Sequence, residues 1–192
     1  LIKGIDTSAA ESMPGVIAVL TAKDVKGSNR IFGLVNHPNH KGDGWERPIL
    51  CDQKIFQYGD PVAVVCAESR EQALAAAENV VLYLEILPAY LTVAEAMQDD
   101  ALEIHPGTPN IYWTQPLVKG EDPESVFNRD DVVTVEGEFR SSRQPHMSIE
   151  PDVAFAFMGD DGLLHIHSKS IGVHLHCLML ANGLGLEPDK LV

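Results

Sequence analysis

Cysteine is scarce in this sequence, and the spacing of the cysteines matches no common disulfide or zinc-ribbon motif. The 192 residues contain three cysteines, Cys51, Cys66 and Cys177, which lie far apart and form no C-x-x-C pair. An odd number at such spacing argues against a disulfide framework and a zinc ribbon, and it favours a reducing compartment. We therefore expect a cytoplasmic protein in which each cysteine is a small buried hydrophobic residue.

Positive charge is scarce as well. The 14 Lys and Arg residues stand against 28 Asp and Glu, which gives a formal net charge of −14. Because such a surface repels phosphate groups and anionic lipids, nucleic acids and membrane surfaces are poor candidate partners. The sequence also lacks a signal-peptide pattern and any apolar run of the roughly 20 residues that span a bilayer. Since no initiator Met is present and an apolar run has only begun at Val192, we expect a piece of a longer polypeptide.

What the sequence does contain is the composition of an ordinary globular protein, with 45% hydrophobic and 22% charged residues. Residues 16–21 and 61–67 predict strands, and the second is apolar enough to be buried on both faces. An Ala-rich helix over residues 71–79 and a strand over residues 80–87 follow. This order predicts a right-handed β-α-β crossover in the first half of the chain.

Shorter signals mark the ends of these elements. Residues 36–48 predict a solvent-facing polar loop. Residues 99–130 are rich in Pro and Gly and have no apolar period, so they predict a long connecting segment and a domain boundary. Three pairs of residues have the spacing of a capping box and predict helix starts: Thr21 with Asp24, Ser69 with Gln72, and Thr92 with Glu95.

The second half of the chain is predicted to be rich in β-structure. Apolar residues alternate with polar ones over residues 133–139, as in a half-buried strand. Residues 153–158 and 163–170 flank the sequence Gly-Asp-Asp-Gly, which predicts a β-hairpin. Residues 174–181 then predict a helix, which the following Asn-Gly pair is expected to end.

Histidines offer the first candidate site. His165 and His167 would share one face of a strand, and together with Cys177 they could bind zinc. No Asp or Glu lies at ligand spacing to complete the set, so structural histidines are the preferred interpretation and the zinc site is an alternative. His37 and His40 are interpreted as solvated residues of the polar loop.

The segment over residues 143–151 is the second candidate. It places several polar side chains between two predicted strands, where sheet formation does not require them. The carboxamide of Gln144 offers two donors and an acceptor and could hold an oxo group or a cofactor oxygen. The alternative is structural: Gln144 caps a strand end and Glu150 pairs with Arg143.

Five stretches spread over the chain carry a more specific pattern: P-G-V-I-A-V-L-T-A-K-D-V at residues 14–25, Y-G-D-P-V-A-V-V at 58–65, Y-L-E-I-L-P at 83–88, V-E-G-E-F at 135–139 and Q-P-H-M-S-I-E-P at 144–151. The first three resemble the a/b hammerhead domain of the xanthine oxidase family of molybdenum hydroxylases. The last two resemble the opening of that family's molybdenum-binding region. Within the family, the second half is most similar to the FAD-independent aldehyde oxidoreductases of sulfate-reducing bacteria.

This resemblance implies an α+β fold. It places an a/b hammerhead domain at residues 1–98 and a connecting segment at residues 99–130. The β-rich N-terminal part of a molybdopterin-binding domain, truncated, is expected at residues 131–192. In the family, the Gln of the Q-x-H motif reaches the molybdenum oxo ligand, so Gln144 is the expected cofactor-binding residue.

The resemblance also implies an activity. Such enzymes oxidise aldehydes to carboxylic acids at a molybdenum–molybdopterin centre, with water as the oxygen source. The cofactor is expected in its cytosine dinucleotide form, with electron transfer through [2Fe-2S] clusters bound upstream of this chain and without FAD. The expected partners are a small aldehyde, an electron-acceptor protein and a second copy of the full-length enzyme in a homodimer.

Departures from the family pattern limit what the chain can do by itself. Ser168-Lys169-Ser170 stands where xanthine oxidases read S-T-Q. The Gly-rich cofactor loop and the catalytic Glu are expected beyond residue 192, so no catalytic or metal-ligating residue is assigned and the chain is expected to be inactive alone. Two alternatives stay open: a xanthine-type heterocycle hydroxylase of the same family, and a non-catalytic acidic interaction or scaffold module.

Overall fold

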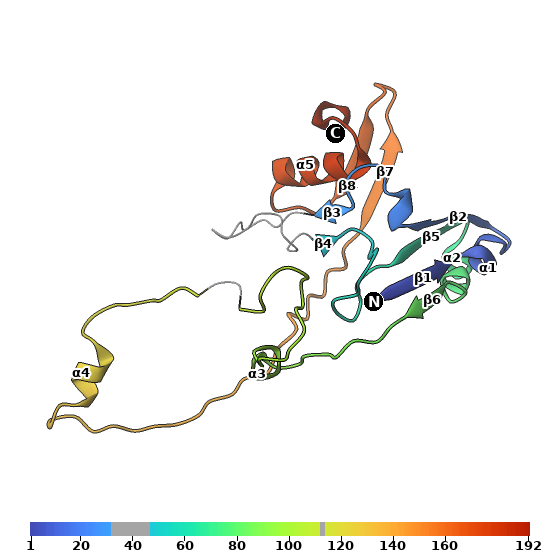
Figure 1. The fold of residues 1–192 in the computed structure, drawn as a ribbon. Coiled ribbons are helices and arrows are strands. Elements are labelled where there is room, and N and C mark those ends of the chain that lie inside the picture. The colour runs from blue at the N-terminus through green and yellow to red at the C-terminus, as the bar shows by residue number, and fades with distance from the viewer. Residues whose placement is uncertain (32–46, 112–113) are drawn as a thin grey trace.

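The structure is a computed structural model that describes residues 1–31, 47–111 and 114–192. Figure 1 shows the chain coloured from blue at the N-terminus to red at the C-terminus. In chain order the elements are β1 (Ile2–Asp6), α1 (Ser8–Glu11), β2 (Val16–Thr21), β3 (Arg30–Ile31), β4 (Arg47–Pro48), β5 (Ala63–Ala67), α2 (Arg70–Ala77), β6 (Val81–Leu84), α3 (Val93–Ala96), α4 (Pro123–Phe127), β7 (Ala154–Met158), β8 (Leu164–Ser168) and α5 (Val173–Leu184), with 3₁₀ turns at Ala22–Asp24 and Pro188–Lys190.

The strands of the described residues form antiparallel pairs, β1 with β6, β2 with β5, β3 with β4 and β7 with β8. Helices α1 and α2 pack on the β2–β5 pair. Their small, closely packed side chains form the core, in which Ala10 and Ala76 are fully buried and Val19 is 8% exposed. This mixture of helices and small sheets confirms the predicted α+β class.

The predicted β-α-β crossover is wrong. The strand, helix and strand exist, but β5 and β6 lie in different sheets and each is antiparallel to a strand from the N-terminal residues. A strand pattern shows that a segment is extended and does not identify its partner, and here β1 and β2 supply those partners. The second face of β5 is not buried either, because α2 covers one face only and Val64 remains 48% exposed.

The predicted capping interactions are formed in the structure, unlike the predicted crossover. The carboxylate of Asp24 accepts hydrogen bonds from the backbone N and the hydroxyl of Thr21 at 2.8 and 3.0 Å. Thr92 and Glu95 form the reciprocal capping box at the start of α3. The Ser69 hydroxyl accepts from the backbone N of Gln72 at 3.3 Å at the start of α2. Each hydrogen bond stays within four residues of sequence, so the local pattern determines it.

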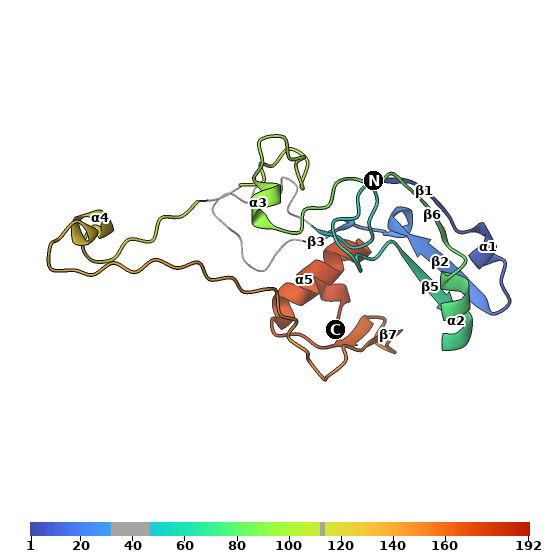
Figure 2. The same ribbon diagram turned by 90° about the horizontal axis from the view of Figure 1, so that it is seen from below.

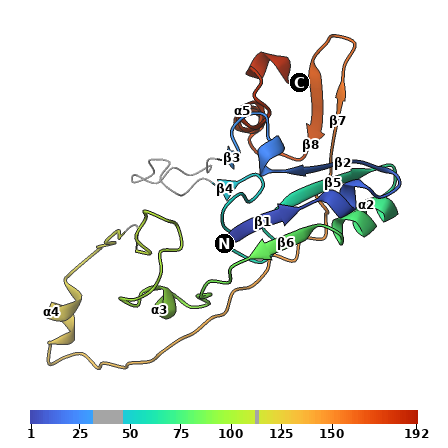
Figure 3. The same ribbon diagram turned by 45° about the vertical axis from the view of Figure 1, so that its right-hand side comes forward.

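The C-terminal part contains the predicted hairpin, with β7 and β8 paired from Ala154 opposite Ser168 to Met158 opposite Leu164. Helix α5 follows and continues past the predicted Asn-Gly stop. It ends at Gly185, whose φ of 67° is the left-handed conformation that glycine adopts most easily at a helix end. Figure 3 shows the hairpin and α5 on one side of the β1–β6 and β2–β5 pairs.

Residues 114–152 form a long excursion that we call the arm. Figures 1 and 2 both show it extending away from the rest of the molecule, with α4 near its far end. The strand predicted over residues 133–139 is wrong: no strand is formed there, and Val133, Val135 and Phe139 are at least 89% exposed. A strand needs a neighbouring strand for its backbone hydrogen bonds, and the described part of the chain provides none for the arm.

Some predictions lie outside the described residues. These are most of the polar loop predicted over residues 36–48, with His37 and His40 in it. The domain boundaries at residues 98 and 130 stay predictions. No helix in the described ranges is both long enough and apolar enough to cross a bilayer.

Candidate functional site

Gln144 lies in the arm, on an exposed and irregular stretch that leads back toward β7. Its side-chain amide donates a hydrogen bond to the Ser142 hydroxyl at 3.2 Å, and among the described residues its carboxamide oxygen is left to solvent. Three residues further on, Met147 has a φ of 53°, an uncommon value for a residue other than glycine, so the segment turns sharply there. The carboxamide of Gln144 is therefore accessible to a ligand.

The end of the same segment is attached to the hairpin by a lysine. Lys169, which follows β8, places its ammonium 3.6 Å from a carboxylate oxygen of Glu150 and 3.3 Å from one of Asp152. The alternative pairing of Glu150 with Arg143 does not occur among these ion pairs. All three side chains are at least half exposed, so each pair contributes at most about 1 kcal/mol. In the sequence, Lys169 stands out only as a departure from the family pattern, because its partners lie 17 to 19 positions away.

A cavity of about 820 Å³ lies beside this attachment, between the hairpin and α5. Its polar rim includes Asp152 and Lys169. Gln144 does not line it, so the candidate cofactor contact and this cavity are separate features. The apolar walls are formed mainly by Val153, Ala154, Ile166, Ile171, Met179 and Leu180.

The histidines of β8 are engaged in local contacts. The Nε2 atom of His165 lies 3.0 Å from a carboxylate oxygen of Asp161, and the ring of His167 stacks on Phe155 with 4.6 Å between ring centroids. The backbone N–H of Leu163 and then His165 hold the pKa of Asp161 below its ordinary value. No group of three His, Cys, Asp or Glu side chains is placed to hold a metal ion within the described ranges, so the zinc site at His165, His167 and Cys177 is not formed there.

The cysteines differ from one another in burial. Cys51 is 1% exposed, and burial raises the pKa of its thiol, which keeps it protonated and unreactive. Cys66 is exposed, which corrects the expectation that all three are buried, because it lies on the face of β5 that no helix of the described residues covers. Cys177 is intermediate and its thiol lies 3.8 Å from the carbonyl oxygen of Pro188.

A smaller cavity of about 300 Å³ adjoins Cys51 and Asp60. The Asp60 carboxylate accepts hydrogen bonds from the backbone N–H groups of Phe56 and Gln57 at 2.9 and 3.1 Å. This arrangement organises a turn, and the carboxylate is already satisfied by it. In the sequence, Asp60 is part of a family motif, and the spacing of three and four residues to its donors indicates its structural role.

Gln144 is the residue of this chain that is expected to contact a pterin cofactor. The neutral amide of Gln144 suits a cofactor oxygen, since it donates without adding charge. Its neighbours from Ser141 to Glu150 are all exposed, and they form no enclosed cradle around it. Gln144 therefore fits such a group by its chemistry, while the remaining walls of a cofactor site are not formed by the described residues.

Comparison with known protein families gives two consecutive matches. Residues 1–88 match the family model described as "Aldehyde oxidase and xanthine dehydrogenase, a/b hammerhead domain". Residues 104–192 match the model of the molybdopterin cofactor-binding domain. The two matches lie in the order that the sequence motifs predicted, and they confirm the resemblance of both halves.

Individual relatives agree with these matches. The chain is 65% identical over its full length to an aldehyde oxidoreductase of Megalodesulfovibrio gigas, and it spans 21% of that protein. It is 31% identical over 98% of its length to the large molybdopterin subunit of a nicotinate dehydrogenase of Eubacterium barkeri, of which it spans 42%. The crystal structure of the aldehyde oxidoreductase of Desulfovibrio desulfuricans superposes with a TM-score of 0.91 at 59% identity, over the whole chain and 21% of that structure. The chain thus corresponds to about a fifth of the length of the aldehyde oxidoreductases that it resembles.

Proposed function

The chain belongs to the xanthine oxidase family of molybdenum hydroxylases, and from this premise we propose that it is part of an aldehyde oxidoreductase. The observation that carries the proposal is the 65% identity to an aldehyde oxidoreductase over the full length of the chain. The substrate would be a small aldehyde and the product the corresponding carboxylic acid. When bound, a molybdenum–pterin centre would supply the two-electron oxidation, with water as the source of the added oxygen.

Within this proposal Gln144 is the cofactor contact that the chain provides. Its amide N–H would donate to an oxo ligand of the metal, and as a neutral donor it would orient that ligand without transferring a proton. Lys169 would act on the same segment as a positioning residue, because its contacts with Glu150 and Asp152 fix the end of the segment against the hairpin.

The further parts of the enzyme are proposed on the same premise. The molybdopterin would be in its cytosine dinucleotide form, electrons would leave through [2Fe-2S] clusters held elsewhere in the protein, and FAD would be absent. An electron-acceptor protein would be the partner, the complete enzyme would be a homodimer, and it would work in the cytoplasm. The chain alone would be inactive, since it provides no assigned catalytic residue.

The test is a substitution of Gln144 in the complete polypeptide that contains this chain. Q144A is expected to lower kcat for aldehyde oxidation about 10- to 100-fold, the usual effect of removing a hydrogen bond next to a metal ligand. The molybdenum content, measured by mass spectrometry, should stay within a factor of two. The matched control is Q53A, which removes an exposed carboxamide from the first half of the chain and should leave kcat unchanged. If Q144A and Q53A have the same kcat, Gln144 is not a cofactor contact.

Metal analysis of the unsubstituted polypeptide tests the wider proposal. About one molybdenum per chain is expected. Absence of molybdenum together with absence of aldehyde oxidation would overturn the enzyme assignment and would favour the alternative of a non-catalytic acidic scaffold.

A second candidate within the family is a heterocycle hydroxylase. It is favoured by the 31% identity to a nicotinate dehydrogenase subunit over almost the whole chain. Assays of the molybdenum-loaded polypeptide with acetaldehyde, benzaldehyde, nicotinate and xanthine separate the two. Higher kcat/KM for the aldehydes supports the first proposal, and higher kcat/KM for nicotinate or xanthine supports the second.

A further inference from the structure

The C-terminal end of α5 contacts a segment from the first half of the chain. Two of its last carbonyl groups accept hydrogen bonds from that segment: Gly27 N donates to the oxygen of Gly183 at 3.0 Å, and Ser28 N donates to the oxygen of Asn182 at 2.8 Å. The last carbonyls of a helix have no partner inside the helix. The first half of the chain therefore caps a helix of the second half, across more than 150 residues of sequence.

We call residues 26–31 the docking strap. It lies so close to α5 that its glycine has no room for a side chain, since a Cβ at Gly27 would lie 1.9 Å from the Asn182 oxygen and 2.5 Å from the Gly185 nitrogen. On the helix side, a Cβ at Gly183 would lie 2.9 Å from the end of the Ile49 side chain. Gly27 thus allows the backbone of the strap to pack directly against the backbone of α5, whereas Gly183 leaves room for the Ile49 side chain.

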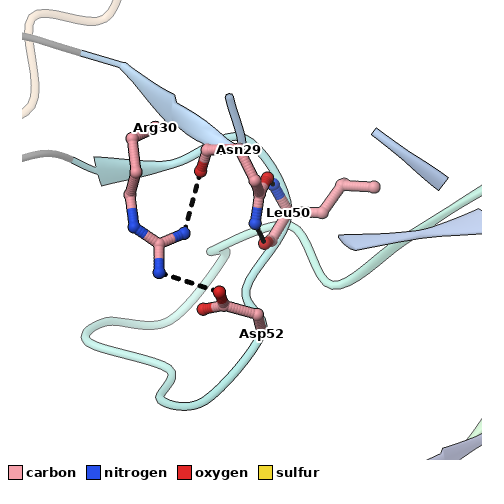
Figure 4. Close-up of polar contacts among 4 residues, drawn as sticks. All are labelled: Asn29, Arg30, Leu50 and Asp52. Atoms are coloured by element: carbon pink, nitrogen blue, oxygen red, sulfur yellow. Dashed lines mark hydrogen bonds and ion pairs between the residues drawn. The ribbon is translucent and has the colours of Figure 1, made fainter. Parts of the chain in front are cut away.

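The other side of the docking strap is fixed to the first half of the chain. The side chain of Asn29 donates to the Leu50 oxygen at 2.8 Å and accepts from the Leu50 nitrogen at 3.0 Å, as a neighbouring strand would (Figure 4). Arg30 donates to a carboxylate oxygen of Asp52 at 2.8 Å. Leu50 and the adjacent Cys51 are buried. The strap is therefore a fixed part of the first half and its amides are held in place for α5.

The covalent connection between the two halves is of a different kind. The arm runs between them without strands and with one short helix, α4, and between Thr114 and Pro151 every residue except Val126 and Val132 is exposed. Such a segment transmits little positional restraint, and exposed extended chain is readily cut by proteases. The docking strap, and not the arm, is thus positioned to determine how α5 sits against the first half.

We propose that the docking strap is an intramolecular interaction surface whose partner is the C-terminal turn of α5, and that it holds the two halves together when the arm is cut. The recognition is by backbone groups: two N–H donors of the strap meet two free carbonyls of the helix. The negative end of the helix dipole, which lies at its C-terminus, adds to the attraction for these donors.

The first test cuts the arm. A recognition sequence for a specific protease is inserted after Gly120, which is exposed and where a Cβ would have no heavy atom within 4 Å, and an affinity tag is placed at the N-terminus. After cleavage of the intact chain, the C-terminal piece is expected to copurify with the tagged piece under native conditions and to separate in 6 M urea. Separation under native conditions would overturn the proposal.

Substitutions identify the surface that holds the two pieces together after cleavage. G27V is expected to lower the copurified fraction at least tenfold, because its side chain would overlap the Asn182 oxygen. N29A, which loosens the strap without entering the contact, should lower it less. The matched control is G172A at the start of α5, where the nearest heavy atom to a Cβ is at 4.0 Å, and it should retain the C-terminal piece. Equal retention by G27V and G172A would refute the assigned surface.

Hydrogen exchange on the uncut chain keeps the proposal testable if cleavage disturbs folding. The amides of Gly27 and Ser28 are expected to exchange at least tenfold more slowly than those of residues 133–139. In G27V this protection should disappear for residues 27–28, while the amides of the β1–β6 pair stay protected. Exchange of Gly27 and Ser28 in the original chain as fast as in the arm would overturn the proposal.

Discussion

Two valines illustrate the difference between the first half of the molecule and the arm. Val19 stands in a continuous apolar run and Val135 in an alternating one, and both segments are predicted as strands, yet Val19 is 8% exposed and Val135 is 89% exposed. Val19 lies on β2, which is paired with β5 and covered by α1 and α2. Val135 has no neighbouring strand among the described residues. A strand-like sequence pattern predicts an extended backbone, but burial depends on a surface from elsewhere in the chain.

The comparison also shows what stabilises the first half. Its core is built from small residues, so helix α2 can approach β2 closely and a few side chains exclude water. The arm contains larger apolar side chains, including Phe139, that are almost fully exposed. The hydrophobic content of a region therefore does not predict whether its side chains are buried. Burial depends on whether another part of the chain packs against them.

The largest effect is expected from a charge in the core of the first half. Ala76 is fully buried on α2, so A76E would place an unpaired carboxylate between α2 and β2 and lower the free energy of unfolding by about 3–5 kcal/mol. The measurement is thermal or urea unfolding followed by circular dichroism. The matched control is A77E, one position along the same helix and exposed, which should change stability by less than about 0.5 kcal/mol. Similar unfolding curves for the two variants would show that α2 does not pack as described.

The direct test of the comparison uses the two valines themselves. V19A removes two buried methyl groups and is expected to lower the free energy of unfolding by about 2 kcal/mol. V135A removes the same groups from an exposed position and should have an effect within about 0.5 kcal/mol. Both variants are measured by urea unfolding of the same chain. A loss of stability in V135A as large as that in V19A would mean that the arm is packed against another surface.

The smallest effect is expected in the hairpin, which is folded but largely exposed. Since hydrogen bonds from Leu163 and then His165 lower the pKa of Asp161 in the folded state, ionised Asp161 stabilises the hairpin at pH values above its ordinary pKa of 3.8. This contribution should be lost as the pH falls below that value toward the folded-state pKa. The stability difference between the original chain and D161N should therefore shrink between about pH 5 and pH 3.

The backbone amide of Leu163, followed by nuclear magnetic resonance, reports this titration locally. The control is D160N, which neutralises the adjacent exposed carboxylate and should leave the pH dependence intact. A stability difference between D161N and the original chain that stays constant over this range would rule out the proposed role of Asp161.

Local features of the fold could be predicted from the sequence. Strand β2, the hairpin of β7 and β8, and the capped start of α3 each depend on residues within a few positions of one another. The pairing of β5 and β6 could not be predicted, because their partners lie more than 40 and more than 70 residues earlier in the chain. The predicted end of α5 is wrong because Asn182 and Gly183 resemble a helix terminator. In the structure their carbonyl oxygens accept hydrogen bonds from the docking strap, and the helix continues to Leu184.

The candidate site likewise has one part that the sequence predicts and another that only the structure shows. The motifs at residues 144–151 pointed to Gln144 and to the family without any structural information, since a family pattern is a property of the sequence. The attachment of that segment through Lys169 is visible only in three dimensions, because two carboxylates before β7 meet a lysine after β8 across the hairpin.

The scarcity of cysteine and of positive charge, the family of the chain and the start of most helices were determined by the sequence alone. They depend on composition or on residues close together along the chain. Tertiary structure alone decided which strands pair, which of two similar valines is buried, and how the first half meets α5. These depend on the distant surface that each backbone group and side chain reaches, and in Gly27 the deciding property is the absence of a side chain where two backbones meet.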